Sequence, residues 1–120
     1  MIFARNILIL IVALLHLYFL VLEMFLWTKP FGLKTFGQSF EKAQASAVLA
    51  ANQGLYNGFL FAGLLWGLMA ANSVVGFQFQ VFFLGCVVVA GMYGGLTVSR
   101  RIFFIQSVPA AVALAFALAA

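Results

Sequence analysis

Charge is scarce in this sequence, because only 7% of its 120 residues are Asp, Glu, Lys or Arg. Hydrophobic residues make up 67% of the chain, and the mean hydropathy is +1.20. A water-soluble domain of this size needs far more polar surface, so the composition excludes the soluble globular class. The sequence therefore predicts an integral membrane protein that has the lipid bilayer as its solvent.

The residue types that carry most enzyme chemistry are also few. Cysteine occurs once, as Cys86, which excludes an intrachain disulfide and a thiol–disulfide exchange enzyme. The chain has one histidine, His16, and two acids, Glu23 and Glu41, which are too few for a closed metal site. Haem ligation by His16 would need a second axial ligand from elsewhere, so the sequence identifies no cofactor. No nucleotide-binding loop or catalytic triad is present.

Four apolar runs are each long enough for a membrane-spanning helix of ~20 residues. We expect one all-α domain over residues 1–120, a polytopic membrane protein with four transmembrane helices in an antiparallel bundle, and spans at residues 6–27, 46–71, 77–98 and 102–119. The first run begins like the core of a signal peptide, but no small-residue cleavage site follows, so we predict a retained helix.

Residues 28–45 form the only long loop. Pro30 and the glycines break helix in its first half, whereas Ser39 predicts a helix cap that leads into the second span. The loop is either a solvated connector or an interfacial segment whose phenylalanines enter the membrane surface.

Lys and Arg are distributed unevenly among the expected loops. Five of the six lie in the first and third loops, at Lys29, Lys34, Lys42, Arg100 and Arg101, and the sixth is Arg5 near the N-terminus. The positive-inside rule then predicts cytoplasmic first and third loops, with both termini facing away from the cytoplasm. Orientation and anionic lipid account for the net charge of +4 without any nucleic-acid partner.

Polar side chains collect in the second expected span, where Gln53, Tyr56 and Asn57 fall on one helix face and Asn52 borders it. The same half of the membrane receives Glu23, expected roughly 6 Å inside the end of the first span. The other spans add further polar groups there. The candidate polar cluster or ligand-binding site therefore comprises His16, Glu23, Asn52, Gln53, Tyr56, Asn57, Tyr93 and Gln106.

Glu23 is the most informative residue of this cluster, because a carboxylate at membrane depth costs on the order of 2.5–3.5 kcal/mol. It either binds a ligand or a proton, or it serves as a structural acceptor for Asn57, Gln53 or Tyr93. We expect it to face the 53–57 stretch across the interface of the first two spans. His16 lies on the same face of the first span, where it relays protons or only bonds a neighbouring helix.

Three strings resemble a known bacterial family. They are HLYFLVLEMFLW at residues 16–27, NQGLYNG at 52–58 with LLWG at 64–67, and FLGCVVVAGMYG at 83–94. Together they are similar to domain-of-unknown-function family 1304, a family of small four-helix membrane proteins, over nearly the whole chain. The resemblance implies four spans in the bacterial inner membrane and adds no activity, substrate or cofactor.

Three function classes remain open. The chain is a small-molecule binding or transport protein with a polar cavity on the cytoplasmic side, a structural or accessory subunit whose polar face holds a partner's helix, or a membrane enzyme with Glu23 or His16 as acid/base. We also expect a homo-oligomer, because Gly91, Gly95 and the Ala-rich fourth span offer close-packing surfaces.

Overall fold

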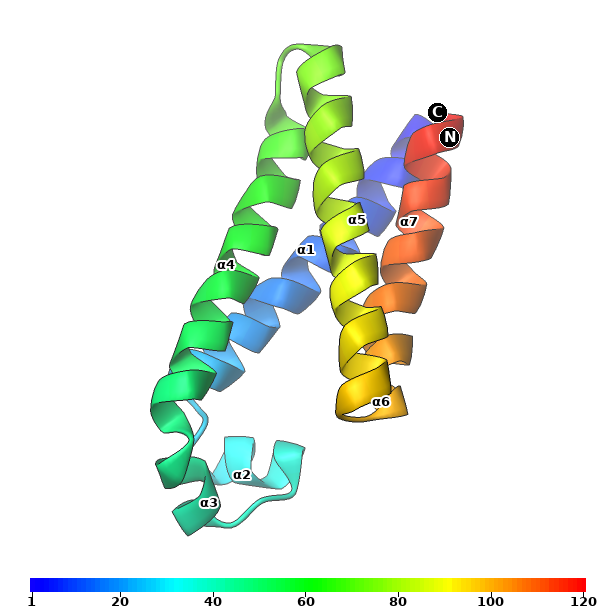
Figure 1. Cartoon of the computed structure of the whole chain (residues 1–120). Coiled ribbons are helices and arrows are strands. Elements are labelled where there is room, and N and C mark those ends of the chain that lie inside the picture. The colour runs from blue at the N-terminus through cyan, green and yellow to red at the C-terminus, as the bar shows by residue number, and fades with distance from the viewer. The chain divides into compact units, whose positions relative to one another are not determined.

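The computed structural model describes residues 1–120, and all of its regular elements are helical, as the sequence predicts. In chain order they are α1 (Ile2–Met24), α2 (Pro30–Phe36), α3 (Phe40–Ala45), α4 (Ala47–Met69), α5 (Ser73–Thr97), α6 (Arg100–Ile102), the π-helical turn η1 (Phe103–Ser107) and α7 (Val108–Ala119) (Figure 1).

Three helical stretches are long and apolar enough to cross a membrane: Ile2–Met24, Ser73–Thr97 and Arg100–Ala119. The last one runs through α6, η1 and α7 without interruption. Helix α4 has 23 residues, which is also sufficient length, but Asn52, Gln53 and Asn57 make it more polar than the other three. A fourth span therefore stays a prediction.

The chain divides into two compact units. The first contains residues 1–14 and 60–120, and the second contains residues 15–59. Helices α1 and α4 each contribute one half to each unit.

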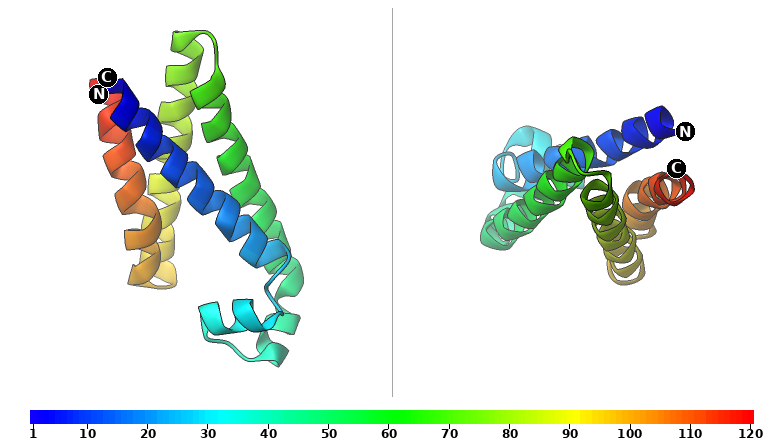
Figure 2. Two further views of the ribbon diagram at one scale, coloured as in Figure 1. Left: turned by 180° about the vertical axis from the view of Figure 1, so that it is seen from behind. Right: turned by 90° about the horizontal axis from the view of Figure 1, so that it is seen from above.

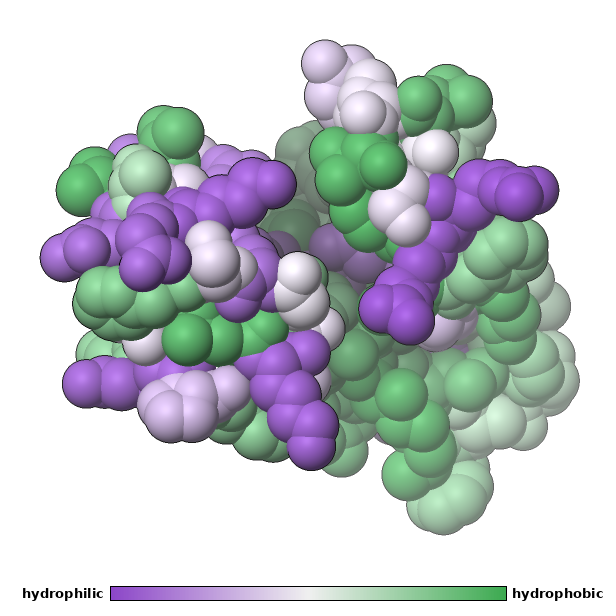
Figure 3. All heavy atoms as spheres, turned by 90° about the horizontal axis from the view of Figure 1, so that it is seen from below, coloured by the Kyte–Doolittle hydropathy of each residue, from purple (hydrophilic) through white to green (hydrophobic).

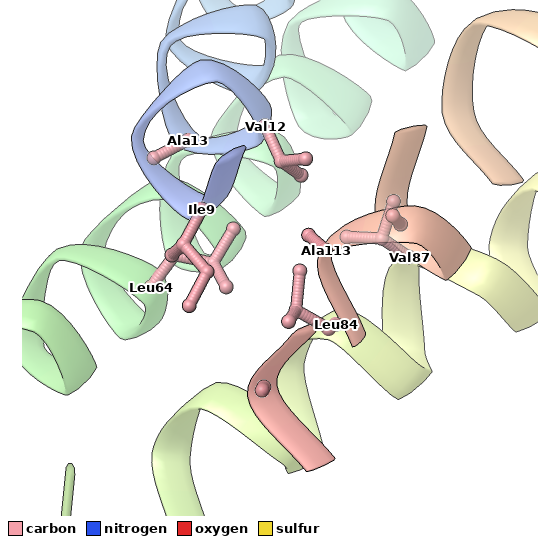
Figure 4. Packing of buried hydrophobic residues seen from close by; sticks show 9 residues of the cluster. Ile9, Val12, Ala13, Leu64, Leu84, Val87 and Ala113 are labelled. Atoms are coloured by element: carbon pink, nitrogen blue, oxygen red, sulfur yellow. The ribbon is translucent and has the colours of Figure 1, made fainter. Parts of the chain in front are cut away.

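The first unit has an apolar core to which four helices contribute. Figure 4 shows the side chains of Ile9, Val12, Leu64, Leu84 and Val87 gathered in it beside α7. The fully buried residues of α7 are all alanines, three or four residues apart and hence on one face, which lets it pack close to α5. The complete set of buried apolar residues in this core is Ile9, Val12, Ala13, Leu64, Leu84, Val87, Ala110, Ala113 and Ala117.

Helix α5 approaches the η1 turn closely at Gly91, where a Cβ atom would lie 2.7 Å from the backbone nitrogen of Ser107. One turn on, a Cβ on Gly95 would lie 2.7 Å from Cβ of Phe103. The Ser107 hydroxyl donates a 2.7 Å hydrogen bond to the carbonyl of Val88. The Gly91/Gly95 edge, expected from the sequence to face another copy, is therefore occupied by the chain's own η1 turn.

The π-helical turn precedes Pro109, which has no N–H to donate to the preceding helical turn. A helix that contains a proline often forms π-type hydrogen bonds, from the N–H of one residue to the carbonyl five residues before it. Here the Val108 N–H bonds to the carbonyl of Phe103. The wide turn comes directly before α7 and contains Ser107, which is buried against α5.

A short turn joins α4 to α5. Asn72 caps α5 by accepting hydrogen bonds from the backbone N–H groups of Val74 and Val75, at 2.9 and 3.1 Å. The buried side chain of Gln80 donates a 3.0 Å hydrogen bond to the carbonyl of Gly67, in the last turn of α4, where carbonyls have no partner within the helix. The two helices are therefore joined by a polar contact as well as by apolar packing.

The second unit contains the end of α1, the short helices α2 and α3, and the start of α4. Helix α1 ends at Met24, three residues before the expected Trp27, and α2 begins at Pro30, a residue favoured in the first turn of a helix. The first half of the loop, expected to be non-helical, thus forms α2. Ser39 caps α3 as predicted, accepting from the Lys42 N–H at 3.2 Å, but a turn at Ser46 separates α3 from α4.

The remaining helix bounds also differ from the expected spans. Helix α5 begins at Ser73 rather than residue 77, because Asn72 caps it there. The last helical stretch begins at Arg100 rather than residue 102, because the Ser99 side chain accepts from the N–H of Arg101 at 3.2 Å. The two chain ends lie beside each other in the first unit, in every view of Figures 1 and 2.

Candidate functional site

Glu23 lies in the last turn of α1, one residue before the helix ends. Because the helix ends at Met24, Glu23 is nearer to the helix terminus than the roughly 6 Å expected from a helix to Trp27. The carbonyl end of a helix carries a partial negative charge, and the last turn of α1 contains no basic residue to offset it. The carboxyl group of Glu23 therefore adds to a locus that is already electronegative.

Two glycines of α4 bring this part of α1 close. A Cβ on Gly54 would lie 3.1 Å from Cβ of Glu23 and 3.3 Å from the carbonyl oxygen of Leu20. A Cβ on Gly58 would lie 2.7 Å from Cδ1 of Leu20. Small residues four apart let two helices approach along one face, so the side chains beside them can meet.

Asn57, between these glycines, meets Glu23. Its Nδ2 donates a 2.6 Å hydrogen bond to Oε1 of Glu23, and both side chains are half-buried. The contact that we expected between Glu23 and the 53–57 stretch is therefore present. The second carboxyl oxygen of Glu23 accepts no hydrogen bond within the chain, so it is available to another donor.

The other polar residues of α4 point elsewhere. Asn52, Gln53 and Tyr56 are exposed, and the Tyr56 ring contacts that of Phe59 at a centroid distance of 6.1 Å. These three residues thus form an exposed polar stripe beside the Glu23–Asn57 pair. If α4 spans the membrane, these amides and this phenol would need partners that the second unit does not supply.

His16 is fully buried and contacts the ring of Phe19 edge-on, at a centroid distance of 5.4 Å. It lies two helical turns before Glu23 on α1. No group of three His, Cys, Asp or Glu side chains gathers anywhere in the chain. The hydrogen-bond donor to Glu23 within the chain is the neutral carboxamide of Asn57.

Tyr93 and Gln106 belong to the first unit. Tyr93 is exposed near the end of α5, and its carbonyl accepts a 2.7 Å hydrogen bond from the Thr97 hydroxyl. Gln106 is half-buried in the π-helical turn, close to Gly91. That these two residues complete the cluster around Glu23 stays a prediction.

Sequence reasoning missed three polar contacts. They are Gln80 with Gly67, Ser107 with Val88, and Trp27, whose Nε1 donates a 3.1 Å hydrogen bond to the Ser46 hydroxyl. Gln80 could have been noticed as a carboxamide inside an apolar run, four residues after Gly76 and so on its face. The Gln80 and Ser107 contacts join neighbouring helices, and the Trp27 contact joins the two ends of the loop between α1 and α4; the Oε1 atom of Gln80 is buried and has no hydrogen-bond partner.

The surface hollows of the chain are shallow and apolar. One lies on the second half of α4 and includes Phe61, Leu65 and Trp66, and another lies on α5 and includes Phe82 and Cys86. Neither includes a residue of the candidate cluster.

The sequence also matches a family model over residues 10–118, described as protein of unknown function (DUF1304). The chain belongs to this family. The chain is also similar to the uncharacterized protein YpaA of Lactococcus lactis subsp. lactis (strain IL1403). The two are 30% identical over 107 residues, which is 88% of each chain. No solved structure matches the chain. The matched stretch contains the whole candidate cluster, from His16 to Gln106.

Proposed function

We propose that this DUF1304 chain is a four-span protein of the bacterial inner membrane, with Glu23 and Asn57 at the centre of a binding site for a small molecule. The observation that carries the proposal is the 2.6 Å hydrogen bond between them, which holds one oxygen of an otherwise unpaired carboxyl group at the end of an apolar helix. An ionisable side chain is costly at membrane depth, and such side chains commonly mark functional sites in membrane proteins.

Four crossings fit the positions of the chain ends. Three helical stretches are apolar enough to span, and α4 has the length for a fourth. The termini lie beside each other in the first unit, and two ends on one side of a membrane require an even number of crossings. The Lys and Arg distribution then favours cytoplasmic loops at residues 28–45 and 98–101, with both termini on the other side.

The electrostatics favour a cationic or hydrogen-bond-donating ligand. The Glu23 carboxyl group and the carbonyl end of α1 have the same sign, and no basic residue lies in that helix turn. The free oxygen of Glu23 is an acceptor, and Asn57 keeps a second N–H and its carbonyl for a polar ligand group. We therefore assign the site to a small organic cation or amine that enters from the membrane or the cytoplasmic face.

The test uses the two acids of the chain as a matched pair. Tetraphenylphosphonium and ethidium serve as probe cations, and their binding to the purified chain is measured by equilibrium dialysis and by thermal shift. Glu23→Gln keeps the shape of the side chain and should abolish binding. Glu41→Gln, on exposed α3, removes the same charge and should leave binding unchanged. The proposal is contradicted if the native chain binds neither probe. It is also contradicted if the native chain and both variants bind the probes equally.

A second candidate is an accessory subunit that holds a partner's transmembrane helix, and the exposed stripe of Asn52, Gln53 and Tyr56 favours it. Amides and phenols at membrane depth bond to other helices where they can. A second copy of the chain is the simplest partner, which keeps homo-oligomerisation as a proposal with this stripe in place of the Gly91/Gly95 edge.

Native mass spectrometry in mild detergents separates these candidates. An accessory or self-associating role predicts a complex that Asn52→Leu with Gln53→Leu dissociates, while Glu23→Gln leaves it intact. If the native chain and the variants are all monomeric, the second candidate is contradicted. The cation-binding test then decides the first candidate.

A further inference from the structure

The α2–α3 segment, defined as residues 28–45, combines exposed cations with exposed aromatic rings. Lys29, Lys34 and Lys42 are all exposed, and the segment contains one acid, Glu41. Phe31, Phe36 and Phe40 have 54%, 44% and 48% of their surface exposed. Over this segment, Figure 3 shows hydrophilic side chains interspersed with hydrophobic ones.

The chain path leaves this segment little freedom to move away from the membrane surface. Five residues separate the end of α1 at Met24 from Pro30, and only Ser46 separates α3 from α4. Helix α1 is apolar enough to span a membrane and α4 is the proposed second span, so the segment lies where both would leave the hydrocarbon region. A solvated connector at this place would have no reason to expose three large rings.

Contacts within the unit hold the segment in one arrangement. The Trp27 indole donates to the Ser46 hydroxyl at 3.1 Å and packs against the Phe36 ring at a centroid distance of 4.8 Å. At Gly32, the α2 backbone approaches so closely that a Cβ would overlap the carbonyl oxygen of Leu26. A preorganised surface loses less conformational entropy on binding than a flexible loop.

We propose that the α2–α3 segment binds the headgroups of anionic phospholipids, with Phe31 and Phe40 inserted at the boundary of the acyl chains. Aromatic side chains favour the membrane interface, and basic residues beside it attract anionic lipid. Each lysine near an anionic surface strengthens the attraction by about fivefold. This inference does not depend on the proposed ligand at Glu23.

The test measures how strongly brominated lipids quench the fluorescence of Trp27. Trp66→Phe leaves Trp27 as the only tryptophan. This variant is reconstituted into bilayers of one fixed mixture of phosphatidylglycerol and phosphatidylcholine, with brominated acyl chains on equal amounts of one lipid or the other. We expect brominated phosphatidylglycerol to quench Trp27 more strongly. The excess should shrink in ~1 M salt, where the Debye length falls to about 3 Å.

Three variants in the Trp66→Phe background make the result specific. Lys29→Gln with Lys34→Gln and Lys42→Gln should remove the excess, and arginine at the same positions should retain it. Phe31→Ser with Phe40→Ser should lower the quenching by both lipids alike. As a positional control, Trp27→Phe leaves Trp66 on α4, which should be quenched equally by both lipids.

Equal quenching of Trp27 by both lipids, or an excess that survives the three glutamines, would overturn the proposal. We expect the glutamine variant to fold, because all three lysines are exposed. Circular dichroism checks that it does.

Discussion

The carboxamide of Asn57 donates a 2.6 Å hydrogen bond to Oε1 of Glu23, from the first half of α4 to the last turn of α1. Gly54 makes this contact possible, since a side chain there would press on Glu23 and Leu20. The only acid within a helix apolar enough to span a membrane is thus held by a neutral donor.

Replacing Asn57 by Leu should destabilise the second unit, because it removes the one donor that reaches Glu23. Interhelical hydrogen bonds in membranes contribute ~0.6 kcal/mol on average and at most ~1.7 kcal/mol, so we expect a loss in that range. Reversible unfolding in mixed detergent, followed by tryptophan fluorescence, measures it. Asn52→Leu is the matched control, because Asn52 is exposed. Equal effects of the two substitutions would show that the bond contributes nothing.

Gly91→Ala should weaken the contact of α5 with the η1 turn, because the new methyl group would lie 2.7 Å from the backbone nitrogen of Ser107. Overpacking of this kind costs about 1–3 kcal/mol. Gly85→Ala is the control on the same helix, because a Cβ there has no neighbour within 4 Å. It should be neutral or stabilise by up to ~1 kcal/mol through helix propensity. Gly91→Ala should therefore lower the melting temperature while Gly85→Ala leaves it unchanged or raises it, and an equal decrease for both variants would contradict this packing.

Gly32→Ala should displace α2 from the end of α1. The methyl group would overlap the carbonyl oxygen of Leu26 and lie 3.2 Å from Cα of Trp27, and backbone atoms cannot move aside as a flexible side chain does. We expect the Trp27–Phe36 contact to open, and Trp27 emission in the Trp66→Phe background to shift. Thr35→Ala, on the exposed side of α2, should leave the spectrum unchanged. An unshifted spectrum for both variants would reject the close approach at Gly32.

Four crossings predict the location of both ends. Alkaline phosphatase fused after Ala120 should be active, because this enzyme matures outside the cytoplasm, and its fusion after Val98 should be inactive. Green fluorescent protein should give the opposite pattern, since it fluoresces in the cytoplasm. A fluorescent C-terminal fusion would exclude the proposed orientation and favour an odd number of crossings or an inverted chain.

The sequence by itself determined the class of the protein. Its scarcity of charge and its long apolar runs predicted an all-helical chain with helices able to cross a membrane, because a bilayer leaves a single chain segment few ways to satisfy its backbone, and the structure has three such helical stretches. The approach of Asn57 to Glu23 was also predictable. The loop between the first two expected spans lets them be antiparallel neighbours with Glu23 and Asn57 at similar depth, and a carboxylate at membrane depth would need a donor.

Other features were decided only by the tertiary structure. The end of α1 at Met24 and the helical turns of α2 accompany the approach of Gly32 to Leu26 and the packing of Trp27 on Phe36, which are contacts that the order of residues does not specify. Gln80 is one carboxamide among several in the sequence, and only its position opposite the Gly67 carbonyl makes it a link between helices.

The faces of the helices were decided in the same way. In a membrane protein, the residues that face lipid are as apolar as those that face the core, so hydropathy along the sequence does not distinguish the two. The sequence therefore suggested Gly91 and Gly95 as an edge for another copy, and the structure fills that edge with Ser107 and Phe103. It also predicted a polar face at residues 52–57, but only the positions of Gly54 and Gly58 against α1 decided that Asn57 turns inward while Gln53 and Tyr56 remain exposed.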